Sequence, residues 1–193
     1  IALARHERIV LADDDVRHDR ATLAALLGEL RDADLVAPQN VFRPRPWHAR
    51  WDTARSLFNR ALTGDYPGTY GVRRSVLWRT GGYDADALFE NLEMQRTISA
   101  ADGRVRSCPD LFVTRLPPSS AYLRAQRVRQ AYDSFAQPAR LLAELALAPT
   151  VFALRRRPGI LCLLVVLGTV VAERGRRRAR GAHVVPRTRA RWA

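Results

Sequence analysis

The spacing of apolar positions at the start of the chain predicts alternating strands and helices. A short apolar run from Ile9 to Ala12 predicts a buried strand of a parallel sheet. Asp19 can cap a following helix, whose apolar side chains recur at the i, i+3, i+4 and i+7 positions of one face: Leu23, Leu26, Leu27 and Leu30. A second short strand is predicted from Asp34 to Pro38. This order of strand, helix and strand is typical of a βαβ unit.

Residues 43–63 predict an amphipathic helix that begins after Pro44 and Pro46. Its large apolar side chains share one stripe, with arginines between them: Trp47, Trp51, Ala54, Phe58 and Leu62. One interpretation is a helix that packs this stripe on the protein core. The other is an interfacial helix, with tryptophan and arginine at the level of lipid headgroups.

Glycines mark turns in the middle of the chain. Gly64 to Gly71 contains three glycines and a proline and predicts a tight loop, and Gly81-Gly82 predicts another turn. A helix is predicted from Phe89 to about Asp102, with Gly103 as its left-handed stop residue. Its inner face would consist of Met94, Ile98 and Ala101.

Two further strands and a helix are predicted before the C-terminal region. Val105 and the run from Leu111 to Val113 fit short strands that are separated by Pro109. The helix is predicted to run from about Ser120 to Gln137, after a pair of prolines.

The C-terminal region contains two apolar stretches, Leu141 to Leu154 and Ile160 to Ala172, with three arginines between them. The second stretch is about 20 Å long as a helix, whereas a membrane span needs roughly 20 residues. We therefore expect a re-entrant or interfacial pair of helices, with the arginines from Arg174 to Arg180 on anionic headgroups of the cytoplasmic face.

Composition supports a globular protein with a basic tail. The chain has 193 residues, 47% of them hydrophobic, and a net charge of +13. Residues 1–149 carry 21 arginines against 18 acids, whereas residues 150–193 carry 11 arginines against Glu173 alone. The excess charge therefore belongs to the tail. Two isolated cysteines favour a reducing compartment, and the start at Ile1 without a methionine predicts a fragment whose N-terminal part is missing.

Three consecutive carboxylates, Asp13, Asp14 and Asp15, follow the first predicted strand directly. Like charges at the end of a buried strand raise the cost of ionising one another. A divalent cation would neutralise them, and oxygen ligands suit Mg²⁺ or Mn²⁺. The alternative is a turn that caps the next helix, although Asp19 already supplies that cap.

Three segments together resemble the family 2 glycosyltransferases with a GT-A fold. They are Ile9 to Asp15 (a strand ending in Asp-x-Asp), Gly81-Gly82-Tyr83-Asp84 followed by Phe89 to Met94, and Gln126 to Gln130. The resemblance covers about residues 1–137, the C-terminal portion of such a domain. It implies an α/β fold with a GT-A-like (Rossmann-like) mixed sheet flanked by helices. Residues 138–193 would follow as a hydrophobic, arginine-rich tail that associates with a membrane.

The resemblance implies an inverting transfer of a sugar from a nucleotide-diphosphate sugar to an acceptor hydroxyl. Asp13 and Asp15 match the positions that hold Mg²⁺ or Mn²⁺ and the diphosphate of the donor. The family usually has an aspartate as general base where this chain has Asn91, so Glu90 or Glu93 would have to replace it.

Gln126 and Arg129 match the Gln-x-x-Arg-Trp motif that binds donor and acceptor, with Gln130 in place of tryptophan. Membrane-attached members that glycosylate lipids are the most similar in character. The expected partners are a nucleotide-sugar donor, a lipid or glycan acceptor and a membrane surface. The expected location is the cell membrane, with the catalytic part on the cytoplasmic face.

Two other functions compete with this one. A non-catalytic, membrane-associated partner protein could retain the GT-A scaffold after losing its base, and Asn91 and Gln130 favour it. A nucleic-acid binder that uses the arginine tail lacks any recognised motif, so no nucleic-acid partner is expected.

Overall fold

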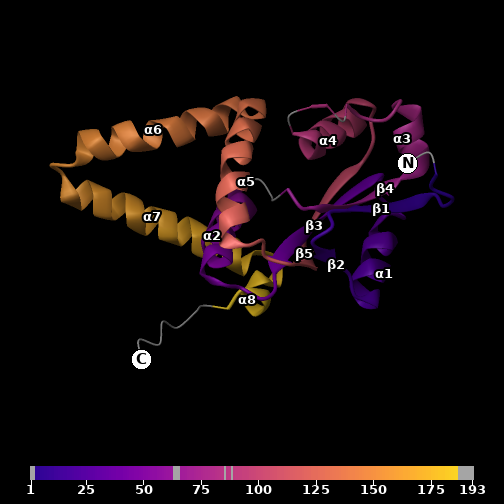
Figure 1. The fold of residues 1–193 in the computed structure, drawn as a ribbon, viewed down its shortest axis with the longest axis horizontal. Coiled ribbons are helices and arrows are strands. Elements are labelled where there is room, and N and C mark those ends of the chain that lie inside the picture. The colour runs from indigo at the N-terminus through magenta and orange to yellow at the C-terminus, as the bar shows by residue number, and fades with distance from the viewer. Residues whose placement is uncertain (1–2, 63–65, 85, 88, 187–193) are drawn as a thin grey trace.

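The computed structural model describes residues 3–62, 66–84, 86–87 and 89–186 as a mixed α/β fold (Figure 1). The described strands form a five-stranded sheet in the order β1-β4-β3-β5-β2. Their bounds are Arg8–Ala12 (β1), Val16–Arg17 (β2), Leu35–Phe42 (β3), Thr69–Arg73 (β4) and Val105–Arg115 (β5). β3 and β5 run parallel, and the other neighbouring pairs are antiparallel. The fold is therefore the mixed sheet that the sequence predicts.

Helices cover both faces of this sheet. The longer ones are α1 (Arg20–Glu29), α2 (Trp47–Leu62), α4 (Glu90–Ala100), α5 (Ser120–Asp133), α6 (Pro138–Leu154) and α7 (Pro158–Arg177). The shorter ones are α3 (Arg74–Arg79), α8 (Gly181–Val184) and the 3₁₀ turns Ser134–Ala136 and Arg178–Arg180. In Figure 1, α1 lies on one face of the sheet and α3 and α4 lie on the other.

Each face has its own apolar core. On the α1 face, Leu26 and Leu30 are fully buried against Val36 and Cys108 of the sheet. On the opposite face, Met94 and Ile98 of α4 pack in a separate cluster with side chains of β3 and β4. The apolar spacing thus predicted four buried positions correctly: Leu26, Leu30, Met94 and Ile98. It was wrong for Leu23 and Ala101, which are exposed.

Asp19 is the N-cap of α1, as predicted, and its carboxylate accepts a hydrogen bond of 2.7 Å from Thr22 N. This bond to a backbone N–H holds the pKa of Asp19 below its ordinary value. Because Asp19 caps α1, the structure does not support a helix-capping role for Asp13, Asp14 and Asp15.

The direction of the first strand was predicted wrongly. β1 pairs antiparallel with β4, from Arg8 opposite Arg73 to Ala12 opposite Thr69, and its apolar side chains are half-buried. A short apolar run indicates that one face of a strand is buried, but it does not indicate whether the neighbouring strand runs parallel or antiparallel.

Two details of the later segments also differ from the prediction. The region around Pro109 is one strand, β5, in which the register against β3 shifts after Cys108, so that Phe112 faces Gln39. A bulge accommodates the proline because the bulged residues make no ladder hydrogen bonds. The left-handed residue after α4 is Asp102, with a φ of 58°, and not Gly103.

The apolar stripe of α2 does not pack on the core. Trp47 and Trp51 are 72% and 76% exposed, and the buried residues of this helix are His48, Ala49 and Arg60. The core-packing interpretation of the stripe is therefore wrong.

Beyond α5, the helices α6 and α7 form a hairpin that extends away from the sheet (Figure 1). Within the described residues, α6 has no buried side chain and α7 buries only Gly175. One described helical stretch, Pro158–Val184, is long and apolar enough to cross a membrane.

Gly103 and Gly28 offer a matched pair of substitutions for testing the packing of α4. A Cβ on Gly103 would lie 2.5 Å from Ile98 Cγ2 and 2.8 Å from Ile98 O, whereas one on Gly28 of α1 would have no neighbour within 4 Å. Gly103→Ala should therefore lower the free energy of unfolding by about 1–3 kcal/mol. Gly28→Ala should raise it by about 0.5–1 kcal/mol, because alanine favours the helix. Urea denaturation measures both, and equal effects would contradict this packing.

Candidate functional site

A cleft of about 660 Å³ lies where the strands β1 and β5 end and the helices α4 and α5 begin. Most of its lining is polar: Asp13, Asp14, Asp15, Glu90, Asn91, Arg115, Ser119, Tyr122 and Gln126, with Leu116, Pro117 and Pro118. Four of the predicted site residues, Asp13, Asp15, Glu90 and Gln126, thus line one cavity although they come from three distant segments of the chain.

Arg115, the last residue of β5, bridges two of the carboxylates. Its Nε donates to Asp15 Oδ2 at 2.8 Å, and its Nη2 donates to Asp13 Oδ2 at 3.1 Å. The side chain of Arg115 is 20% exposed, so water screens these ion pairs only partly. Arg115 therefore neutralises part of the negative charge that the three aspartates bring together.

The backbone fixes the loop that carries these aspartates. Asp13 N donates to Gly68 O at 2.7 Å, and Leu116 N donates to Asp15 O at 2.8 Å. A Cβ on Gly68 would lie 2.2 Å from Asp13 Oδ2, so a larger residue at this position would displace the Asp13 carboxylate. The two carboxylates are thus held in place by both the β4 and the β5 sides of the sheet.

Burial raises the pKa of Asp13 above its ordinary value, and the neighbouring Asp15, Glu90 and Asp14 raise it further, against the opposing effect of Arg115. The charged form of this carboxylate is therefore disfavoured in the folded protein. Asp15 Oδ1 is buried and has no hydrogen-bond partner in the structure. An additional cation at this point would stabilise the charged form of Asp13 and would give Asp15 Oδ1 a partner.

The two carboxylates fit a divalent metal ion only if other ligands complete its shell. Within the described residues, no group of three or more histidine, cysteine or acidic side chains could hold a metal by itself. Mg²⁺ commonly binds one or two carboxylates and takes its other ligands from water and substrate phosphates. The unpartnered Asp15 oxygen and the oxygen-only donor set suit that mode of binding.

The structure separates the two glutamates that the sequence offers as a base. Glu90 is the first residue of α4, is exposed and lines the cleft beside Asn91. Glu93 lines a different depression, where it accepts a hydrogen bond of 3.3 Å from Thr97 Oγ1. The ring of Phe89, just before Glu90, contacts the Tyr66 ring at 4.8 Å between centroids, which positions the start of α4.

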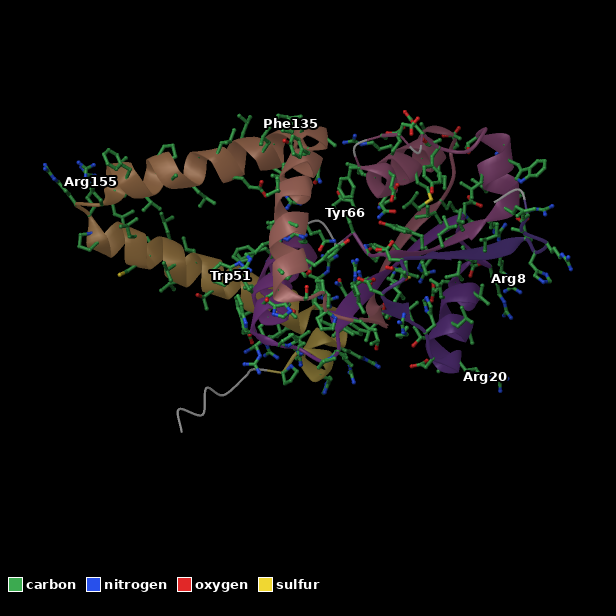
Figure 2. All side chains as sticks on the ribbon, in the orientation of Figure 1. Arg8, Arg20, Trp51, Tyr66, Phe135 and Arg155 are labelled. Carbon is green, nitrogen blue, oxygen red and sulfur yellow. The ribbon has the colours of Figure 1, made fainter. Side chains whose placement is uncertain are left out.

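Gln126 of α5 lines the cleft and also a smaller adjoining chamber of about 100 Å³. Asp15 and Arg115 line both spaces as well, and Tyr66, labelled in Figure 2, lies at the wall of the inner chamber. Arg129 is in α5, three positions after Gln126, but its side chain lies outside the described part of the structure.

Sequence reasoning missed Arg115 and the residues that hold the wall formed by α5. His48 Nε2 of α2 is 2.8 Å from Pro118 O, in the loop before α5. Asp52 of α2 forms an ion pair with Arg127 of α5. α2 therefore holds both this loop and α5 in place. The only signal for Arg115 was a cation at the end of a strand, about 100 positions after the aspartates. Pairing over such a distance becomes visible only in the fold.

No protein-family profile and no curated protein matches this sequence. Among solved structures, the chain is similar to the mannosyltransferase PcManGT from Pyrobaculum calidifontis in complex with GDP-Man and Mn²⁺, with a TM-score of 0.51 and 20% sequence identity. The similarity covers 94% of this chain and 60% of that chain, so this chain spans less than two thirds of the length of that protein. The likeness shows that the chain shares the fold of that structure.

Replacing Arg115 tests whether the paired aspartates form a cation site. Arg115→Gln should lower the free energy of unfolding by about 1–2 kcal/mol, because Asp13 and Asp15 would lose a partly buried partner. Added Mn²⁺ should raise the unfolding midpoint of this variant more than that of the unaltered protein, since the ion can occupy the vacated position.

Arg106→Gln is the matched control, because Arg106 pairs with Glu29 at the surface and is 53% exposed. This substitution should lower the free energy of unfolding by less than about 0.5 kcal/mol. Added Mn²⁺ should raise its unfolding midpoint no more than that of the unaltered protein. Equal Mn²⁺ responses in the two variants would contradict a cation site at the aspartates.

Proposed function

We propose that this chain is part of a glycosyltransferase that moves a sugar from a nucleotide-diphosphate sugar to an acceptor hydroxyl by inverting displacement, as in family 2. The observation that carries the proposal is the cleft in which Asp13, Asp15, Glu90 and Gln126 meet. The glycosyltransferase fold supports it. Because the chain spans 60% of the similar structure, the proposal concerns the full-length protein.

In this proposal, Asp13 and Asp15 hold Mg²⁺ or Mn²⁺ together with the diphosphate of the donor. The ion, when bound, would supply positive charge against the negative charge that develops on the leaving diphosphate. Arg115 contributes a guanidinium beside both carboxylates, where its planar fork can bind phosphate oxygens once the aspartates have another partner. Gln126 and Arg129 are the proposed contacts to donor and acceptor from α5.

Glu90 is the better of the two proposed catalytic bases. An inverting displacement needs a group that takes the proton of the acceptor hydroxyl while that oxygen attacks the sugar. Glu90 lines the cleft, whereas Glu93 lines a separate depression and bonds to Thr97. The amide of Asn91 lines the cleft but cannot accept a proton at neutral pH, so its role would be to orient a hydroxyl.

The proposed acceptor is a lipid or a glycan, and the proposed location is the cytoplasmic face of the cell membrane. The exposed tryptophans of α2, the apolar hairpin of α6 and α7, and the arginine-rich end of the chain support a membrane surface as partner.

A non-catalytic, membrane-associated partner protein is the second candidate function. Asn91 favours it, because the family has its usual base at that position. Such a protein would bind a nucleotide-sugar without turnover, whereas the transferase would consume it.

Asp15→Asn in the full-length protein should reduce metal-dependent transfer or hydrolysis of the nucleotide-sugar by at least about 10²-fold, because it removes a charged metal ligand. Asp14→Asn is the matched control and should retain activity within about threefold, since its carboxylate is not held by Arg115. A radiochemical transfer assay and the unfolding midpoint of each variant provide the readouts. Full activity of a folded Asp15→Asn protein would overturn the metal assignment.

Glu90→Gln and Glu93→Gln compare the two candidate bases under the same assay. Loss of a general base typically costs 10²–10⁴-fold, so Glu90→Gln should lose about that much in kcat. Glu93→Gln should change kcat by less than about threefold, because its side chain lies outside the cleft. Comparable activity in both variants would remove Glu90 from the mechanism.

A further inference from the structure

Arg60 holds the base of the α6–α7 hairpin against the sheet. It lies on α2, is 2% exposed and donates a hydrogen bond of 3.1 Å to Gly175 O of α7. The same guanidinium donates to Gln39 Oε1 of β3 at 2.9 Å and to Pro109 O of β5 at 2.7 Å. It also bonds to Arg178 O, so one buried side chain joins four segments of the chain.

Glycines allow the chain to approach so closely at this point. A Cβ on Gly175 would lie 1.9 Å from Leu57 O of α2, and one on Gly181 would lie 2.8 Å from Arg60 Nη2. Arg178 completes the contact, because its side chain donates to Arg60 O. The described residues directly after α7, Arg178 to Gly181, therefore pack against α2.

Above this anchored base, α6 and α7 expose large apolar side chains. Examples are Leu145, Leu147 and Phe152 of α6 and Leu163, Val165 and Val170 of α7. α2 continues the same surface, because Phe58 lies beside Gly168 of α7. Figure 2 shows Trp51 where α2 meets α7. Such a surface requires an apolar partner.

The positive charge of this region favours an anionic lipid surface as the partner. Residues 145–186 contain eight arginines and one acid, Glu173. A second copy of the chain would bring the same positive charge to the contact, whereas anionic lipid headgroups would complement it. Each arginine near an anionic surface strengthens binding by about fivefold.

The geometry argues against a hairpin that crosses the bilayer. α6 has 17 residues, about 25 Å of helix, and a hydrocarbon core is about 30 Å thick. Perpendicular insertion would carry Arg155, Arg156 and Arg157 of the apex into that core, and each arginine there weakens insertion by roughly 10²-fold. Figure 2 shows Arg155 at the far end of the hairpin. The last part of the apolar stretch Pro158–Val184 is also held by Arg60 through Gly175.

We propose that the α6–α7 hairpin and the exposed stripe of α2 lie together along the headgroup region of an anionic bilayer, with Arg60 fixing the hairpin to the catalytic domain. This inference rests on the membrane association included in the proposed function and gives it a geometry. It places the cleft at a set distance from the lipid surface, because the hairpin cannot pivot about its base. Binding to vesicles is measured independently of sugar transfer. A protein that transfers sugar but does not bind vesicles would contradict only this inference. A protein that binds vesicles but does not transfer sugar would contradict only the proposed function.

Cys162 provides a natural probe of this geometry. It is exposed on α7, whereas Cys108 is buried and burial raises the pKa of its thiol to about 11, so a maleimide fluorophore will label Cys162 selectively. The emission of an environment-sensitive label should shift to the blue with vesicles of equimolar phosphatidylglycerol and phosphatidylcholine, and much less with phosphatidylcholine alone. Lipids with a quencher near the headgroup should quench it more than lipids with a quencher at the chain end.

Stronger quenching from the chain end would overturn the in-plane arrangement. A blue shift that depends on protein concentration and needs no vesicles would assign the surface to a second copy of the chain. Absence of any shift with anionic vesicles would also overturn the proposal.

Gly175→Ala and Gly159→Ala separate the anchor from the hairpin itself. Both glycines lie in α7, but a Cβ on Gly159 would meet nothing within 4 Å. Gly175→Ala should increase amide hydrogen exchange in α8 by at least about tenfold and allow deeper quenching of labelled Cys162, because the helix loses its close contact with α2. Gly159→Ala should match the unaltered protein.

If Gly175→Ala fails to fold, Arg178→Gln provides the second test, since it removes only the bond to Arg60 O. Exchange and quenching that stay unchanged in folded Gly175→Ala or Arg178→Gln protein would overturn the role of Arg60.

Discussion

The bridge from Arg115 to Asp13 and Asp15 is the interaction on which the proposed chemistry depends. Two aspartates on one short loop repel each other, and only a cation makes their proximity tolerable. Arg115 supplies that cation from the end of β5, while Gly68 and Leu116 hold the loop through its backbone. In the proposed function a metal ion would bind at these carboxylates, where one buried oxygen of Asp15 has no hydrogen-bond partner.

The helices around this bridge connect the cleft to a surface of different character. α5 begins at the cleft and leads through a 3₁₀ turn into α6, and α2 supports α5 through the ion pair of Asp52 with Arg127. α2 also carries Arg60, which anchors α7 to the sheet. α2 thus both supports the α5 side of the cleft and holds the apolar hairpin.

Local patterns in the sequence predicted much of the fold and of the candidate site. The spacing of Leu26 and Leu30, the cap at Asp19 and the acidic loop after the first strand each depend on neighbouring residues. Features that depend on distant segments escaped prediction: the antiparallel partner of β1, the bulge in β5, the bridge by Arg115 and the buried position of Arg60. All 32 basic residues of this chain are arginines, and nothing in the local sequence distinguishes the buried Arg60 from the other 31. The separation of Glu90 from Glu93 likewise required the orientation of α4.

Calorimetric titration with Mn²⁺ in the presence of a nucleoside diphosphate tests most directly that Asp13 and Asp15 form the metal site. The unaltered chain should bind one Mn²⁺ ion, and the double variant Asp13→Asn with Asp15→Asn should lose that binding while it remains folded, as its circular dichroism spectrum would show. Equal binding of Mn²⁺ by the folded double variant would contradict the account.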